Sequence, residues 1–320
     1  MSPRRPRVGV LGAVALGLVL LGALVGFARL PDADPASPGP ASSSGGDRSA
    51  GDGAPARPNA SARTPRERIF DDGRFLVAFY GTAGTGALGV LGETPPDVAF
   101  ARLAREAARF ERPRQPVLPV FELIVTIADP FPGPDGDYAH DLPRAAVQRY
   151  IDAARRHGAL LVLDLQPGRT DFTTAAKRWA WALRDPYVGL ALDPEWRMAR
   201  GEVPGQVIGS VDAAEINRTT AWLADLQQRH RLPQKLLVLH QFRTDMITRI
   251  GSVQPRRSLA MVQHVDGFGT PGQKLDTFAA VAQPQRFRMG FKLFYDEDVD
   301  LMDPTAVHRI RPKVRFVSFQ

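Results

Sequence analysis

The chain has 320 residues, no cysteine and a formal net charge of +7. The absence of cysteine excludes disulfides, thiolate metal sites, a cysteine nucleophile and a lipidated N-terminal cysteine. The four arginines of the first 30 residues, Arg4, Arg5, Arg7 and Arg29, supply four of the positive charges. The remaining cations are spread along the chain without a basic block, so we expect no nucleic-acid partner.

The first 30 residues predict export. Residues 8–28 carry no charged side chain, and a stretch of about this length can cross a bilayer as a helix. The arginines before it predict a cytoplasmic N-terminus, with everything after Ala28 outside. A cleaved signal peptide is the alternative, because Gly26 and Ala28 are small enough for a cleavage site. Both interpretations predict an extracytoplasmic protein, either membrane-anchored or secreted.

Residues 31–67 are rich in proline, alanine, serine and glycine and contain almost no large apolar side chains. Such a segment cannot offset the entropy of ordering by burial, so we predict a disordered linker. Residues 68–320 remain for one folded domain, and about 250 residues is the usual size of a (β/α)8 barrel.

Short apolar runs rich in strand-forming residues alternate with helical patterns from residue 74 onward, as in parallel βαβ units. We predict strands at 75–81, 116–127, 159–166, 187–193, 235–242, 259–266, 288–296 and 314–320. We predict helices at 96–112, 143–157, 172–184, 211–230, 244–250, 273–283 and 304–309. An open doubly wound sheet is the structural alternative, but the loop after the first strand, residues 81–86, lacks G-x-G-x-x-G spacing. The fold class we expect is α/β, a closed (β/α)8 barrel.

Strand side chains alternate between two faces, so parity predicts which of them point into the barrel. The inward rows end in polar residues at the carboxyl ends of the strands, where barrel enzymes build their active sites. These residues are Tyr80, Glu122, Asp164, Gln166, Asp193, His240, His264, Asp266, Lys292, Asp296 and Ser318. An internal hydrogen-bonded network that only plugs the barrel is the structural alternative.

The segment Asp193-Pro194-Glu195-Trp196 follows the fourth predicted strand. It predicts two neighbouring carboxyl groups at the barrel mouth, one of them holding a proton. Trp196 would offer a stacking surface for a sugar. The same residues also fit a plain helix start, with Asp193 as N-cap and Pro194 at the first helical position.

The segment G-L-A-L-D-P-E-W, residues 189–196, resembles the fourth-strand signature of chitinase-like and lysozyme-like (β/α)8 glycoside hydrolases, in which the strand ends in D-x-E. The resemblance implies that Glu195 is the general acid and Asp193 its partner, acting on an amino-sugar polymer. The chain departs from the chitinase pattern at Ala191, where that pattern has a further aspartate. It departs from the lysozyme pattern in lacking an acidic residue on the first strand.

Glycoside hydrolysis needs one carboxyl group as acid and a second as nucleophile or base. We expect Glu195 as the acid and Asp296 or Asp164 as the second group, with Asp193 as partner of Glu195. This chemistry needs neither a cofactor nor a metal, and we expect none. The side chains expected to bind the polysaccharide are Tyr80, Glu122, Gln166, Trp196, His240, His264, Asp266 and Lys292.

Two other functions fit the same residues. His240 and His264 with Asp193 or Asp266 are reasonable zinc ligands, an arrangement that resembles amidohydrolase barrels. Those barrels carry H-x-H on the first strand, where this chain reads Ala-Phe-Tyr. The other alternative is a non-catalytic barrel that binds an envelope glycan or protein through Trp196 and Tyr80.

Overall fold

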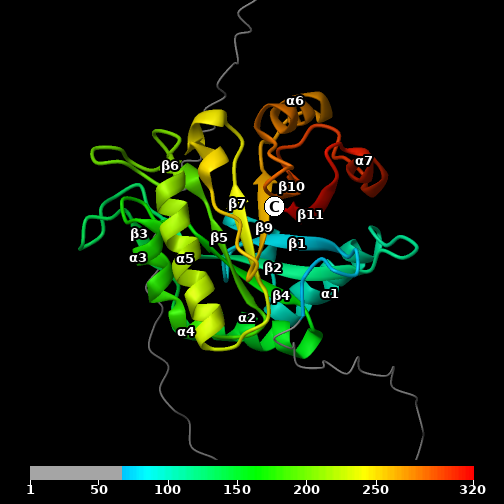
Figure 1. Cartoon of the computed structure of the whole chain (residues 1–320), viewed down its shortest axis with the longest axis horizontal. Coiled ribbons are helices and arrows are strands. Elements are labelled where there is room, and N and C mark those ends of the chain that lie inside the picture. The colour runs from blue at the N-terminus through cyan, green and yellow to red at the C-terminus, as the bar shows by residue number, and fades with distance from the viewer. Residues whose placement is uncertain (1–66) are drawn as a thin grey trace, which may run out of the picture. The chain divides into compact units, whose positions relative to one another are not determined.

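The computed structural model describes residues 67–320 (Figure 1). The predicted signal segment, 1–30, and all but the last residue of the predicted linker, 31–67, lie outside the described residues. Within residues 67–320, none of the helices is both long and apolar enough to cross a membrane.

Eight parallel strands close into a barrel, which confirms the predicted fold class for this part of the chain. The sheet closes because β1 pairs in parallel with β2 on one side and with β11 on the other. The predicted runs overlap all eight strands, and the largest error is at β10, which ends three residues before the run we predicted. The barrel strands are β1 (Phe75–Gly81), β2 (Val117–Ala128), β4 (Leu160–Leu165), β5 (Val188–Leu192), β7 (Lys235–His240), β9 (Leu259–Val265), β10 (Arg288–Leu293) and β11 (Val314–Phe319).

Helices connect most consecutive barrel strands and lie outside the sheet (Figure 1). They are α1 (Pro96–Ala108), α2 (Arg144–His157), α3 (Phe172–Arg178), α4 (Ala180–Leu183), α5 (Ala213–Arg229), α6 (Pro271–Val281) and α7 (Pro304–Arg309). The Asp212 side chain caps α5 by accepting a hydrogen bond from Ala214 N at 2.9 Å. Gly158, in the left-handed conformation with φ 67°, ends α2 and turns the chain into β4. A short strand, β3 (Ala139–Asp141), pairs antiparallel with the end of β2.

The helix predicted at 244–250 is wrong. This segment forms a 3-10 turn at Thr244–Met246 and the short strand β8 (Ile247–Thr248), which pairs with β6 (Val211–Asp212). A second 3-10 turn follows at Ile250–Ser252. Arg249 between them has φ 56°, which lies outside the right-handed helical region. Met246 and Ile247 are buried and Ile250 is partly buried, a spacing that also fits a helix, so the apolar pattern alone did not distinguish the two structures.

Two apolar layers hold the domain together. The larger one lies between the strands and the helices and includes Leu190 and Leu192 of β5. The smaller one fills the barrel interior with alternate residues of the strands, as parity predicts. The inner layer comprises Ile69, Leu76, Ala78, Val120, Leu160, Val162, Ala191, Leu236, Val238, Ala260, Val262 and Phe316. Toward the carboxyl ends of the strands, the same inward rows change from apolar to polar residues.

Candidate functional site

Polar side chains from all eight barrel strands, or from the residue that follows one, meet at the carboxyl end of the barrel interior. All of them are at most 7% exposed. We call this set the barrel-end cluster: Tyr80, Glu122, Asp164, Asp193, His240, His264, Asp266, Lys292 and Ser318. Strand parity predicted that these residues point into the barrel at this end, and the structure places them there.

His240 is the centre of the barrel-end cluster. Its Nδ1 lies 2.8 Å from Asp266 Oδ2, and its Nε2 lies 3.1 Å from Glu122 Oε1. Burial disfavours the charged imidazolium, but the Asp266 and Glu122 carboxyl groups outweigh it and raise the pKa of His240 well above its ordinary value. His240 therefore favours its charged form and lies between two acidic side chains.

Asp164 and Tyr80 form the second part of the barrel-end cluster. The Tyr80 hydroxyl donates a hydrogen bond to Asp164 Oδ2 at 2.9 Å and accepts one from Gln166 Nε2 at 3.3 Å. The Lys292 ammonium lies 3.4 Å from the centroid of the Tyr80 ring, within the range of a cation–π contact. Burial raises the pKa of Asp164 to about 6, with Glu122 adding to the effect and His240 opposing it.

His264 differs from its neighbour because no acidic side chain among residues 67–320 pairs with it. Its Nε2 lies 2.7 Å from Ser318 Oγ, and its ring meets that of His240 edge-on at 5.2 Å between centroids. Burial, reinforced by the His240 and Lys292 charges, lowers the pKa of His264 well below its usual value. The ring fits because residue 290 is glycine: a Cβ there would lie 2.4 Å from His264 Nδ1. The two adjacent imidazoles thus favour opposite protonation states: His240 favours the charged form and His264 the neutral form.

Asp193 and Glu195 stand at the start of the loop that follows β5. Pro194–Trp196 form a single 3-10 turn, and Asp193 Oδ1 accepts a hydrogen bond from Glu195 N at 3.2 Å. The capping interpretation of this segment is therefore correct for one Asp193 oxygen, although the turn is 3-10 and no α-helix follows. Asp193 is buried, whereas Glu195 and Trp196 are half-buried. Glu195 is thus the carboxyl group of this region that is most open to a ligand.

Burial and the charges of neighbouring acids raise the pKa values of both residues. For Glu195, burial is the largest cause and the charge of Asp266 the next, and its pKa rises to about 7. The pKa of Asp193 is raised well above its ordinary value by burial and then by the charges of Asp164 and Glu195, against the opposing charge of His240. Glu195 can therefore hold and release a proton near neutral pH.

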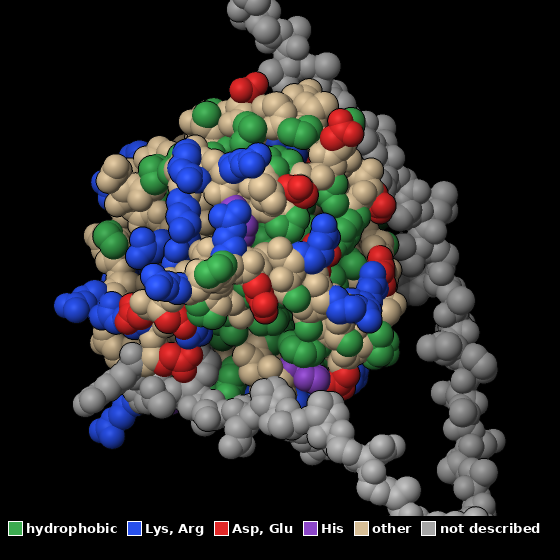
Figure 2. All heavy atoms as spheres, turned by 90° about the vertical axis from the view of Figure 1, so that its right-hand side faces the viewer, with side chains coloured by type: hydrophobic (Ala, Val, Ile, Leu, Met, Phe, Trp, Pro, Cys, Tyr) green, Lys and Arg blue, Asp and Glu red, His purple; other side chains and the backbone are tan. Residues whose placement is uncertain are grey.

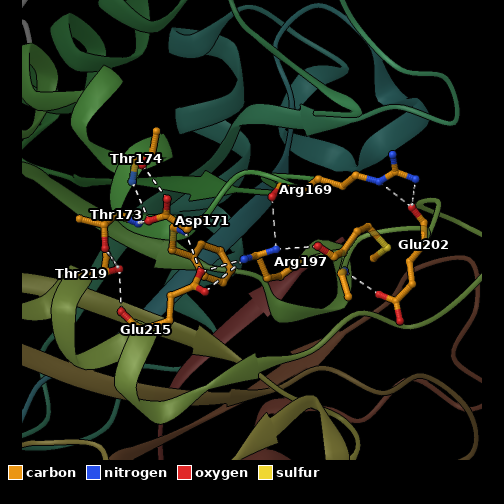
Figure 3. Close-up of polar contacts among 11 residues, drawn as sticks. Arg169, Asp171, Thr173, Thr174, Arg197, Glu202, Glu215 and Thr219 are labelled. Atoms are coloured by element: carbon orange, nitrogen blue, oxygen red, sulfur yellow. Dashed lines mark hydrogen bonds and ion pairs between the residues drawn. The ribbon is translucent and has the colours of Figure 1, made fainter. Parts of the chain in front are cut away.

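A network of charged side chains fixes the loop that carries Glu195 (Figure 3). Arg197 Nε lies 3.0 Å from Glu215 Oε1 on α5, and its Nη1 donates to Met198 O at 2.6 Å. The same Glu215 oxygen accepts from Phe172 N at 2.9 Å, which joins the loop to the start of α3. The Glu195 carbonyl accepts from Gly209 N at 2.7 Å and closes the far side of the loop. These contacts set the backbone on both sides of Glu195.

Asp296, predicted to point inward as a possible second carboxylate, is exposed in a turn after β10. The strand ends at Leu293, so the parity of the strand does not extend to residue 296. The buried acid of this loop is Asp298, which sequence reasoning missed. It accepts from Phe294 N at 2.9 Å and pairs with Lys274 Nζ at 2.9 Å. Lys274 also donates to Lys292 O at 2.9 Å, so the pair supports the strand end that carries Lys292.

The zinc alternative gains no support from this geometry. Both ring nitrogens of His240 already face carboxyl oxygens of Glu122 and Asp266. In the described range 67–320, no group of three or more histidine or acidic side chains has an arrangement that could hold a metal ion.

Four polar atoms of the barrel-end cluster are buried and have no hydrogen-bond partner among the described residues. They are Glu122 Oε2, Asp164 Oδ1, His264 Nδ1 and Asp266 Oδ1. A network that only plugged the barrel would gain stability by pairing these atoms, since a buried unpaired polar group costs roughly 1–3 kcal/mol. Each of these atoms can therefore still form a hydrogen bond with a ligand or with solvent.

Comparisons with known proteins give no family. The sequence matches no protein-family model, and a search of curated proteins finds no significant match. The barrel-end cluster and the loop after β5 therefore carry the functional argument alone.

Proposed function

We propose that the barrel is a glycoside hydrolase that acts on an envelope or extracellular polysaccharide, with Glu195 as its general acid. The observation that carries this proposal is the position of Glu195 together with its raised pKa. It is half-buried at the carboxyl end of the barrel, and its pKa is raised to about 7 by burial and by Asp266. A carboxyl group in this state can protonate a leaving glycosidic oxygen at neutral pH.

The second carboxyl group of the proposed reaction is Asp266. Among the charged neighbours of Glu195, Asp266 has the largest effect on its pKa. One Asp266 oxygen faces His240, while the other has no partner within the described part of the chain. Asp164 is the less suitable candidate of the two, because it is fully covered and bound to the Tyr80 hydroxyl.

Aromatic side chains at the same end of the barrel suit a carbohydrate. Phe294, which follows β10, lies 5.2 Å from the Lys292 ammonium. Phe268, which follows β9, packs edge-on against Phe294 at 6.0 Å and is 54% exposed. An exposed aromatic ring offers an apolar face to the C–H groups of a sugar ring. Trp196, half-buried beside Glu195, offers a second such surface.

The decisive experiment compares two variants of residues 67–320, which contain the whole barrel, on a panel of envelope polysaccharides with detection of new reducing ends. Glu195→Gln keeps the size of the side chain and removes its proton, so turnover should fall by about 10²–10⁴-fold. Asp296→Asn is the matched control: it also neutralises one acid after a barrel strand, but in an exposed turn, and it should leave turnover unchanged.

Full turnover by Glu195→Gln would remove the glycosidase proposal. Binding of a glycan with no turnover by the unmodified protein or by either variant would favour the non-catalytic alternative.

A further inference from the structure

The opposite end of the barrel carries a cluster of basic side chains. Figure 2 views the side of the molecule on which α7 lies in Figure 1, and Lys and Arg side chains gather over one half of it. We call this set the basic face. It comprises Arg112 between α1 and β2, Arg288 at the start of β10, and Arg311, Lys313 and Arg315 at the start of β11. The amino ends of parallel strands share one edge of a barrel, so residues far apart in the sequence meet there.

These cations repel one another. Burial and the charges of Arg315, Arg311 and Arg112 lower the pKa of Lys313. Burial and the charge of Arg288 lower the pKa of Arg315. Within the described residues none of the five side chains forms an ion pair; the nearby carboxyl group of Asp72 pairs with Arg74 at 2.6 Å. The basic face is thus an excess of positive charge that the domain itself does not neutralise.

The basic face is spread over a surface. Arg112, Arg288, Arg311 and Lys313 are exposed and Arg315 is half-exposed. They come from three separate chain segments. Exposed point charges from three separate segments suit an extended anionic surface better than a single small anion, which needs donors converging on one point.

The N-terminal segment joins the barrel at this same end. Gln234, which directly precedes β7, donates its backbone N–H to Glu67 O at 3.3 Å, and its side-chain oxygen accepts from Ile69 N at 3.1 Å. The 66 residues that precede Glu67, with the predicted membrane segment 8–28 among them, therefore connect on the side of the basic face.

We propose that the basic face docks the barrel on a bilayer surface that contains anionic phospholipids. Lipid phosphates would neutralise the repelling cations, and the carboxyl ends of the strands would point outward. This inference is independent of the glycosidase proposal.

The test is co-sedimentation of residues 67–320 with vesicles of equal parts phosphatidylglycerol and phosphatidylcholine. These residues contain all eight barrel strands and both apolar layers, so they can fold without the N-terminal segment. The variant Arg112→Gln/Arg288→Gln/Lys313→Gln should lower the affinity for these vesicles roughly a hundred-fold. The control Lys177→Gln/Arg200→Gln/Arg218→Gln removes the same charge from exposed positions elsewhere and should bind like the unmodified domain. Both variants should keep the unfolding temperature of the parent.

Loss of binding in the first variant only, together with weak binding to pure phosphatidylcholine and release by salt, would support the proposal. Equal losses in both variants, or equal binding to charged and neutral vesicles, would overturn it. Binding to soluble polyphosphate without binding to anionic vesicles would also overturn it, because the partner would then be a polymer.

Discussion

The Glu195 carboxyl group is partly exposed and nevertheless has a raised pKa. A carboxyl group that water can reach ordinarily keeps its pKa near the model-peptide value, because water solvates its charge. Here burial of part of the side chain and the charge of Asp266 act in the same direction and raise its pKa to about 7. Lys292 and His240 oppose the shift without cancelling it. The residue can therefore reach a ligand while still carrying its proton.

The raised pKa of Glu195 predicts a pH-dependent stability difference. The folded pKa lies above the unfolded value of 4.5, so the folded state binds the proton more tightly. This contribution is fully present below pH 4.5 and is lost as the pH rises toward 7. Glu195→Gln, which cannot ionise, should match the parent at pH 4 and be more stable than it at pH 8 by about 3 kcal/mol. Urea unfolding at the two pH values measures the difference, and a pH-independent difference would contradict the assigned shift.

Residue parity predicted most of the barrel-end cluster from sequence. Glu122, Asp164, His240 and His264 lie where a period of two places them, because each stands inside an extended strand or at its end. The inward position predicted for Asp296 was wrong, because the period of two was applied to residues that form a turn. The neighbourhood of Asp266 and Glu195 could not be predicted either, since it depends on how two loops fold over the barrel end.

The loop after β5 shows how one element depends on another. The sequence shows the D-P-E-W turn, but Glu215, which holds the loop, lies on α5 and is 18 residues from its partner Arg197. No local pattern relates the two positions, because the contact forms only when α5 packs beside α3. The Arg197 and Glu215 side chains are 19% and 12% exposed, so water screens their interaction only in part.

Breaking this pair should loosen the loop that carries Glu195. Arg197→Gln removes the charge and leaves Glu215 partly buried without its cation, which should cost about 2 kcal/mol of unfolding free energy. Turnover should fall along with stability, while the pair Arg197→Gln/Glu215→Gln should recover part of the stability. Chemical denaturation of both single variants and the double variant measures the coupling. Strictly additive losses would show that the two side chains do not act together.

At the scale of the whole molecule, the two ends of the barrel carry different charge patterns. The carboxyl end gathers buried acids and histidines, and the amino end exposes the basic face. The closed eight-strand barrel could be predicted, because alternating strand and helix patterns are local. The basic face could be predicted only in part, because Arg311, Lys313 and Arg315 are close in the sequence whereas Arg112 and Arg288 are distant and join them only when the barrel closes.

The packed core of the domain also includes a residue that precedes the first strand. Ile69 precedes β1 by six residues, yet it is fully buried and packs in the inner apolar layer with Leu76 and Phe316. Ile69→Ala should therefore leave a cavity at the amino end of the barrel and lower the unfolding free energy by about 3 kcal/mol. Arg68→Ala, one residue earlier, alters an exposed side chain and should change it by less than about 0.5 kcal/mol. Urea unfolding of the two variants measures both effects. Equal stability of the two would mean that residues 67–70 lie against the barrel without closing it, and that the folded domain begins at β1.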